Sequence, residues 1–282
     1  MKLVETSAEL LPFISGEDGI YKMIERAGRT CYKSTDKMTD DSAKPFVERM
    51  IKSGHTAMLE HGTVYLMVKL PDDEITPSES LYHYKNNKHS VYNVANRTAY
   101  VTTNFRVLVE NEWLDDLKYL CEPTIWHEKR YTFRMVTSIG VTRELNRHRV
   151  NSIAEQSTRY CNYAKDKFGN EITFCKPVWA PDYDEADWDR FLKALFEAEN
   201  AYLGLINQGW QPQQAREVLP LCTASEIIHT AFASDWRFFF DLRLFAKTGN
   251  PHPNMLLLAQ KMKAEAEDKD VWNDIMRYHS KF

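Results

Sequence analysis

A band of positive charge directly after a strand-like stretch is the feature that most constrains how this chain folds. Residues 130–141, RYTFRMVTSIGV, alternate well enough for a β-strand. Residues 143–160, RELNRHRVNSIAEQSTRY, follow and contain four arginines, one histidine, two glutamates and two serines. Cationic groups packed beside a core strand cost free energy unless an anion compensates them. The pattern therefore predicts an anion-binding site next to a sheet, with a solvated basic helix face as the alternative.

The chain as a whole is slightly acidic, which bears on its partners. Its 282 residues carry a net charge of −4, and 43% of them are hydrophobic. Nucleic-acid-binding domains are usually basic, so we expect no nucleic-acid partner. No apolar run approaches the ~20 residues that span a bilayer, and the N-terminus lacks the pattern of a signal peptide. We expect no membrane association and a cytoplasmic protein, located in the host cytoplasm if the source is a virus.

Periodicity and breaker residues predict a mixture of helices and strands. Strands are predicted at residues 63–70, 98–111, 130–141 and 169–179, and helices at residues 19–32, 41–55, 113–122, 185–209 and 212–221. The last hundred residues are predicted to be helical, including the apolar stretches 225–246 and 253–276. Since no linker stands out, we expect one α+β domain over residues 1–282, with helices packed on a mostly antiparallel sheet.

The arginines of the cationic segment suit phosphate groups. Arg147 and Arg149 flank His148, and a guanidinium donates two parallel hydrogen bonds to a phosphate. Ser157 and Arg159 are two residues apart and can offer a hydroxyl, a guanidinium and backbone N–H groups to one anion. These spacings favour binding of a phosphorylated ligand.

Two further arginines lie outside this segment, in less polar surroundings. Arg216 lies in QAREVLP, and Arg243 lies in the phenylalanine-rich stretch RFFFDLRLF. A buried arginine is normally paired or bound to a ligand. Arg243 is therefore a candidate ligand-binding residue, and a core arginine paired with a carboxylate is the alternative.

The segment SGHTAMLEHG, residues 53–62, supplies His55 and His61. No H-x-x-x-H or C-x-x-C spacing accompanies them, so no metal site is expected. Their positions favour structural or hydrogen-bonding histidines.

The residues quoted above also match a known family. Arg147, His148 and Arg149, then seven residues, then Ser157 form the pattern R-H-R-x7-S. The chain resembles the flavin-dependent thymidylate synthases in this pattern and in further segments that follow in family order: GRTCYKS, GHTAMLEH, STRYCNYAKDKFGNEITF, AREVLP, WRFFFDLR and NPHPNM.

The resemblance implies a reaction and a set of ligands. It implies reductive methylation of deoxyuridine monophosphate (dUMP) to thymidine monophosphate. Methylenetetrahydrofolate then gives the carbon, and FAD reduced by NADPH gives the hydride. It also implies a homotetramer whose active sites are shared between chains.

The resemblance assigns roles residue by residue. Arg243 matches the arginine that polarises the uracil and is therefore the expected catalytic residue. The expected FAD-binding residues are His55, Arg147, His148 and Arg149. The expected nucleotide-binding residues are Glu144, Glu155, Gln156, Ser157, Thr158, Arg159 and Arg216, of which Arg216 reaches the nucleotide from another subunit.

The chain departs from the family pattern in two places. Polar flavin partners of the family are replaced by Phe232, Ser234 and Phe238. This change leaves open a related enzyme that makes a hydroxymethyl-type product. Residues 71–128 form an apparent insertion, in which TTNFR, residues 102–106, either touches substrate or forms a strand edge; we favour the strand edge.

Overall fold

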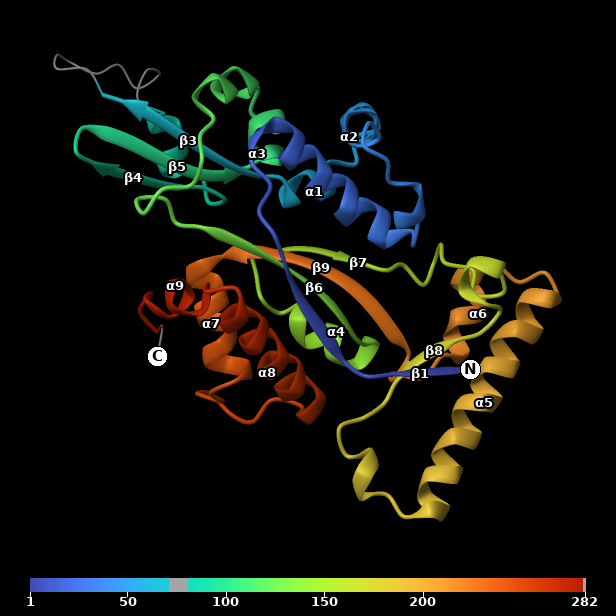
Figure 1. The fold of residues 1–282 in the computed structure, drawn as a ribbon. Coiled ribbons are helices and arrows are strands. Elements are labelled where there is room, and N and C mark those ends of the chain that lie inside the picture. Colours follow the sequence, from blue (N-terminus) through green and yellow to red (C-terminus); the bar gives the residue numbers. More distant parts are fainter. Residues whose placement is uncertain (71–80, 281–282) are drawn as a thin grey trace.

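The central element is a four-stranded antiparallel sheet in the order β2-β6-β9-β7. The computed structural model describes residues 1–70 and 81–280. The strands of this sheet are β2 (Ser7–Leu11), β6 (Arg130–Ser138), β9 (Ala224–Phe232) and β7 (Ser152–Glu155). Figure 1 shows the sheet between two layers, with α1 and α2 above it and α4, α7, α8 and α9 below it. The expected α+β fold with a mostly antiparallel sheet is therefore confirmed.

The helices differ widely in length. The α-helices are α1 (Gly16–Cys31), α2 (Ala43–Lys52), α3 (Phe105–Glu110), α4 (Ile139–Leu145), α5 (Glu185–Asn207), α6 (Pro212–Ala215), α7 (Ala233–Arg243), α8 (Pro253–Asp268) and α9 (Trp272–Met276). Short 3₁₀ helices are η1 (Thr35–Lys37), η2 (Thr56–His61), η3 (Tyr82–Asn86), η4 (Leu114–Tyr119), η5 (Asp166–Phe168), η6 (Ala180–Asp182) and η7 (Arg216–Val218). Within the described ranges, no helix is both long enough and apolar enough to cross a membrane.

Alternation along the paired strands builds the main core. Phe133 and Met135 of β6, with Ile227 of β9, join one buried cluster that includes Trp236 of α7 and Met262 of α8. Successive strand residues point to opposite faces, so the intervening residues of β6 and β9 face α1 and η2 instead. The sheet is therefore buried on both faces along β9, where seven consecutive residues from Ser225 to Ala231 are buried.

A second sheet lies beside the first, in the order β3-β5-β4. Its strands are β3 (Thr63–Lys69), β5 (Thr98–Asn104) and β4 (Val91–Ala95), and Leu66 and Val101 pack with Ile24, Val47 and Phe105 in its core. A separate parallel pair joins β1 (Lys2–Val4) to β8 (Thr173–Cys175). The first ten residues of the expected insertion, 71–80, lie outside the described residues. The neighbouring β3 already belongs to the same sheet as β4 and β5, so the added sheet begins before residue 71.

Several sequence predictions need correction. The last hundred residues are not all helical, because Ala224–Phe232 forms β9. A strand buried on both faces is a continuous apolar run, which periodicity does not separate from a buried helix. The strand-edge interpretation of TTNFR is also wrong, since β5 is the middle strand of its sheet. The short strands β1, β2, β4 and β7 are not among the predicted strands.

Two predicted strands end earlier than expected because a side chain caps the next helix. The Ser138 side chain accepts a hydrogen bond from the Val141 N–H at 3.4 Å, which starts α4. Asn104 accepts one from the Val107 N–H at 3.2 Å and starts α3. Serine and asparagine are favoured at this position because they satisfy N–H groups that lack helical partners.

Buried histidines, among them His61, His148 and His229, make the fold sensitive to acid. Burial lowers the pKa of His61 to about 3 and that of His148 to about 4, in each case aided by a nearby arginine. The pKa of His229, which faces Trp236 with ring centroids 4.5 Å apart, lies well below its ordinary value, chiefly because of burial. The unfolded chain therefore binds more protons than the folded chain below about pH 6.5, and stability is lost as pH falls.

We predict that His229→Phe reduces this pH dependence. Neither ring nitrogen of His229 has a hydrogen-bond partner in the described chain, so phenylalanine removes no such bond. Each neutral buried histidine adds up to ~1.4 kcal/mol per pH unit to the slope. Urea unfolding at pH 7 and pH 5 should show a smaller loss for His229→Phe than for the wild type, by about 1–2 kcal/mol. The exposed His279 provides the control: His279→Phe should leave the loss unchanged, and equal slopes for all three proteins would contradict the assignment.

Candidate active site

Arg243, the last residue of α7, contacts one residue of α4 and one residue that follows it. Its Nη1 donates to Glu144 Oε2 of α4 at 2.7 Å, and its Nε donates to His148 Nε2 at 3.2 Å. The side chains of Arg243 and Glu144 are 19% and 27% exposed, so this ion pair is only partly desolvated. The structure thus brings together three of the expected site residues from positions about a hundred residues apart.

His148 is held neutral at this point. It is buried, and the edges of its ring meet Phe239 and Phe238 at centroid distances of 5.0 and 6.1 Å. Burial, with a further contribution from the Arg243 charge, lowers the pKa of His148 to about 4. Because its Nε2 accepts from Arg243, the proton of the neutral ring lies on Nδ1. Nδ1 is buried and has no partner among the described residues, so it is a donor available to a ligand.

The remaining cations of the segment have no acidic partners. Arg147 and Arg149 are exposed on either side of His148, and Arg143 and Arg159 are exposed as well. None of the four forms an ion pair with another described residue, although most other arginines in the chain do. The solvated helix face with internal ion pairs is therefore not what the structure contains.

A second group of expected site residues lies just beyond the end of β7. Glu155 Oε1 accepts from Ser225 Oγ at 2.9 Å, and Arg216 Nη1 donates to Thr158 Oγ1 at 3.1 Å. The Ser157 N–H donates to the carbonyl of Cys31 at 2.9 Å, which ties this loop to the end of α1. Gln156 is buried, and its Nε2 donates to the hydroxyl of Tyr163 at 3.3 Å.

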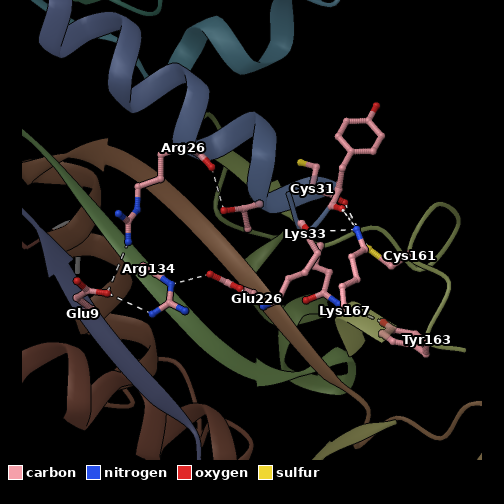
Figure 2. A network of polar contacts seen from close by, with 12 residues as sticks. Glu9, Arg26, Cys31, Lys33, Arg134, Cys161, Tyr163, Lys167 and Glu226 are labelled. Carbon is pink, nitrogen blue, oxygen red and sulfur yellow. Dashed lines mark hydrogen bonds and ion pairs between the residues drawn. The ribbon is translucent and has the colours of Figure 1, made fainter. Parts of the chain in front are cut away.

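Charged side chains join Lys33, which follows α1, to the main sheet beside this loop, as Figure 2 shows. Glu226 of β9 pairs with Lys33 and, at 2.6 Å, with Arg134 of β6, which also pairs with Glu9 at 3.3 Å. Burial opposes ionisation of Glu226, but hydrogen bonds and charges from Lys33 and Arg134 outweigh it, so its pKa is lowered. The cations of this network are thus neutralised by their own chain.

Lys167 joins the 156–167 loop to the residues that follow α1. Its Nζ donates to the carbonyls of Tyr32 at 3.2 Å and Lys33 at 3.1 Å (Figure 2). These contacts hold the residues after α1 against the 156–167 loop. Arg159 forms no ion pair with a described acid. Its guanidinium lies over the ring of Tyr160, with Cζ 5.2 Å from the ring centroid.

His55 lies close to this second group. It lines a cavity of about 470 Å³ together with Cys31, Met58, Arg106 and Tyr160. Tyr160 follows Arg159 directly, and its ring meets that of Tyr32 at 5.3 Å. His55 therefore belongs with the loop after β7 and not with His148.

The expected site residues thus form two groups within one chain. The first group lies at the start of β7 and consists of Arg147, His148 and Arg243. The second group lies beyond the end of β7 and includes Arg159 and Arg216. Four extended residues separate them by roughly 13 Å. Convergence of all these arginines on one pocket stays a prediction for an assembly of chains.

Of the three departures from the family pattern, only Phe238 contacts the first group. Phe232 packs against the guanidinium of Arg130, with the ring centroid 5.4 Å from Cζ. The Ser234 N–H donates to Glu128 Oε1 at 2.9 Å, and Phe238 packs against His148. Sequence reasoning did not single out Arg130, because it reads as the first residue of a strand.

The fold and these two groups are suited to small molecules that carry phosphate. A family model described as thymidylate synthase complementing protein matches residues 80–270. The match covers more than half of the chain, and the protein belongs to this family.

Curated relatives agree with this assignment. The chain is 33% identical over 103 residues to the flavin-dependent thymidylate synthase of Pyrococcus furiosus, covering 36% of this chain and 41% of that protein. It is 30% identical over 135 residues to the flavin-dependent thymidylate synthase of Geobacter sulfurreducens, covering 46% and 55%. The matched part spans about half the length of these relatives.

A solved structure with the same overall extent is a UMP/dUMP methylase, PolB, from Streptomyces cacaoi bound with 5-Br dUMP. It is 17% identical, with a TM-score of 0.46, and the match covers 98% of this chain and 97% of that one.

We predict that Glu144→Gln destabilises the protein by about 1 kcal/mol, because it removes the carboxylate that pairs with a partly buried arginine. Glu217→Gln is the matched control. Glu217 is 76% exposed and lies 3.6 Å from the Nε of Arg216, so its removal should cost almost nothing. Urea unfolding at neutral pH measures both. If the two variants lose the same stability, the Arg243–Glu144 pair does not hold α7 to α4.

Proposed function

We propose that this protein is a flavin-dependent thymidylate synthase that reductively methylates dUMP to thymidine monophosphate. In this proposal methylenetetrahydrofolate gives the carbon and NADPH gives the reducing equivalents. The observation that carries the proposal is the contact of Arg243 with Glu144 and His148, because it unites the R-H-R segment with the arginine of the WRFFFDLR segment. Membership of the family supports it.

Residues around His148 fit an FAD cofactor. The buried Nδ1–H of His148 is a donor without a partner, and Arg147 and Arg149 are exposed guanidinium groups without acidic partners among the described residues. These three residues would hold the cofactor and neutralise its pyrophosphate. FAD, when bound and reduced, supplies the hydride that converts the transferred carbon to a methyl group.

Arg243 is the proposed catalytic residue. Its guanidinium is fixed by hydrogen bonds to Glu144 and His148 and so needs no reorganisation during the reaction. A fixed positive charge at the carbonyl edge of a uracil would stabilise the negative charge that develops as C5 attacks an electrophilic carbon. Glu144 orients this arginine and offers its second oxygen to the nucleotide.

The loop after β7 would take the phosphate and sugar of the nucleotide. Ser157, Thr158 and Arg159 present hydroxyl, backbone and guanidinium donors, and Arg216 joins them through Thr158. Glu155 and Gln156 are held by Ser225 and Tyr163 and shape the base of this loop. His55 lies in the adjoining cavity.

The distance between the two groups favours a site built from more than one chain. A loop that binds phosphate in one subunit would complete the Arg243 group of another. The proposed assembly is a homotetramer. In it, the two groups of one chain stay apart, and each group meets the other group of a neighbouring chain at an interface.

A related product is the second candidate, because Phe232, Ser234 and Phe238 replace polar residues. Phe238 lies against His148, so it makes the proposed flavin site drier and less polar. If hydride delivery were slower, water would add to the transferred methylene carbon in place of hydride and leave a hydroxymethyl group on the pyrimidine. Mass spectrometry of the nucleotide product distinguishes a methyl from a hydroxymethyl group.

Arg243→Ala tests the proposal. We expect the purified wild type to be yellow, to bleach with NADPH and to methylate dUMP. In Arg243→Ala, flavin absorbance should remain while turnover falls by about 100-fold or more. Arg190→Ala is the control, because Arg190 is 80% exposed and distant in the chain from both groups, and it should keep full turnover. Wild-type protein that never binds flavin, or retained turnover in Arg243→Ala, would overturn the assignment.

A further inference from the structure

A cavity of about 870 Å³ lies beside β2 and the start of β6, between the start of α1 and the end of α8. β2, the start of α1, the end of η2 and the start of β6 form most of its wall. None of the proposed catalytic, cofactor-binding or nucleotide-binding residues lines it. Its volume lies within the range of sites that hold a drug-sized molecule.

The wall of this cavity is largely apolar and aromatic. Leu11, Ile20 and Met23 line it from β2 and α1, and Tyr65 lines it from β3. Phe13 lies at the edge of Tyr65, with ring centroids 5.3 Å apart, and is 45% exposed. Such a wall suits a flat aromatic body, which gains from edge-to-face contact as well as from burial.

His61 contributes a polar group without a partner. The residue is fully buried, and its Nδ1 is hydrogen-bonded to Thr230 Oγ1 at 2.9 Å. Its Nε2 has no partner within the described chain, and it carries the ring proton when the Thr230 hydroxyl donates to Nδ1. A buried polar atom left in this state costs free energy that a ligand can recover.

Arg130 contributes a buried positive charge that makes no ion pair with a described carboxylate, although the charges of Glu60 and Asp235 act on it from farther away. Its Nη atoms donate only to neutral groups: the Glu60 carbonyl, Thr63 Oγ1 and Ser152 Oγ, each at 3.1 Å. Its Nε has no partner, and no described carboxylate lies within ion-pair distance. Burial lowers the pKa of Arg130 to about 10, which leaves it charged at neutral pH.

The acids near the cavity are already engaged. Glu9 pairs with Arg134 at 3.3 Å, and Glu265 accepts a hydrogen bond from the Leu10 N–H at 3.1 Å. The cavity therefore presents an aromatic wall together with a cation that makes no ion pair with a described carboxylate, and a bound anion would pair with it.

We propose that this cavity is a second binding site for a small aromatic anion, with the anionic group directed to Arg130 and His61 and the ring held by Tyr65, Leu11 and Met23. The site is independent of the proposed function, because it uses none of the residues assigned to methylation. Occupation would tie α1 and β2 of the main sheet to β3 of the second sheet.

A matched pair of probes tests this site. 8-Anilinonaphthalene-1-sulfonate carries an anionic group, and N-phenyl-1-naphthylamine has the same aromatic skeleton without it. Equilibrium dialysis should give one sulfonate probe bound per chain, with the neutral probe bound at least tenfold more weakly. Arg130→Gln should weaken the sulfonate probe at least tenfold and leave the neutral probe unchanged.

Two control variants locate the effect. Arg237→Gln removes another poorly exposed arginine, paired with Asp241 and outside the cavity, and should bind both probes as the wild type does. Arg149→Gln, at the proposed active site, should also leave the affinity unchanged. Met23→Trp fills the cavity and should weaken both probes, so it tests the site even if Arg130→Gln fails to fold.

Thermal unfolding monitors the integrity of each variant. Equal affinity of the sulfonate probe for Arg130→Gln and wild type, or an undiminished affinity in Met23→Trp, would overturn the proposal. So would a loss of affinity in Arg149→Gln as large as that in Arg130→Gln, because the probe would then occupy the active site.

Discussion

The pairing of β6 with β9 is the interaction on which the site depends. Nine residue pairs, from Arg130 with Phe232 to Ser138 with Ala224, align the two strands in antiparallel register. A nine-residue strand is about 30 Å long. Because the strands are antiparallel, the helix after β6 and the helix after β9 start at opposite ends of this ladder. α7 and α4 are about 16 and 10 Å long and run back toward each other, so Arg243 meets Glu144 between them.

Charge compensation divides the cations of the chain into two classes. Arg134 and Lys33 are neutralised by Glu226 and Glu9 and fasten the end of α1 to the sheet (Figure 2). Arg147, Arg149 and Arg159 are left without acidic partners and remain exposed. The first class stabilises the fold, and the second class is free to bind phosphorylated ligands. Density of arginine in the sequence does not distinguish them, since the acids that neutralise the first class come from distant strands.

The second sheet shapes the surroundings of the segment GHTAMLEH. His61 ends η2, and β3 begins two residues later and leads into the second sheet. The junction between the two sheets buries Arg130 and His61 beside a large cavity. The motif GHTAMLEH thus serves two regions: His55 faces the loop after β7, while His61 faces the cavity on the α1 side. Six residues in the sequence separate these two environments because η2 turns the chain between them.

Local chemistry in the sequence was enough to predict the mixed fold, the helix α5, the strand beginning at Arg130 and the family to which the chain belongs. Period-two alternation and capping residues act over a few positions, and the R-H-R-x7-S pattern is contiguous. Only the tertiary structure decided that Ala224–Phe232 is a strand, that Arg243 pairs with Glu144 and His148, and that Arg130 makes no ion pair with a described carboxylate. Each of these depends on partners that lie about twenty to a hundred residues away. Burial on both faces erases the alternation that would mark β9, and ion pairs between distant segments leave no trace in local spacing.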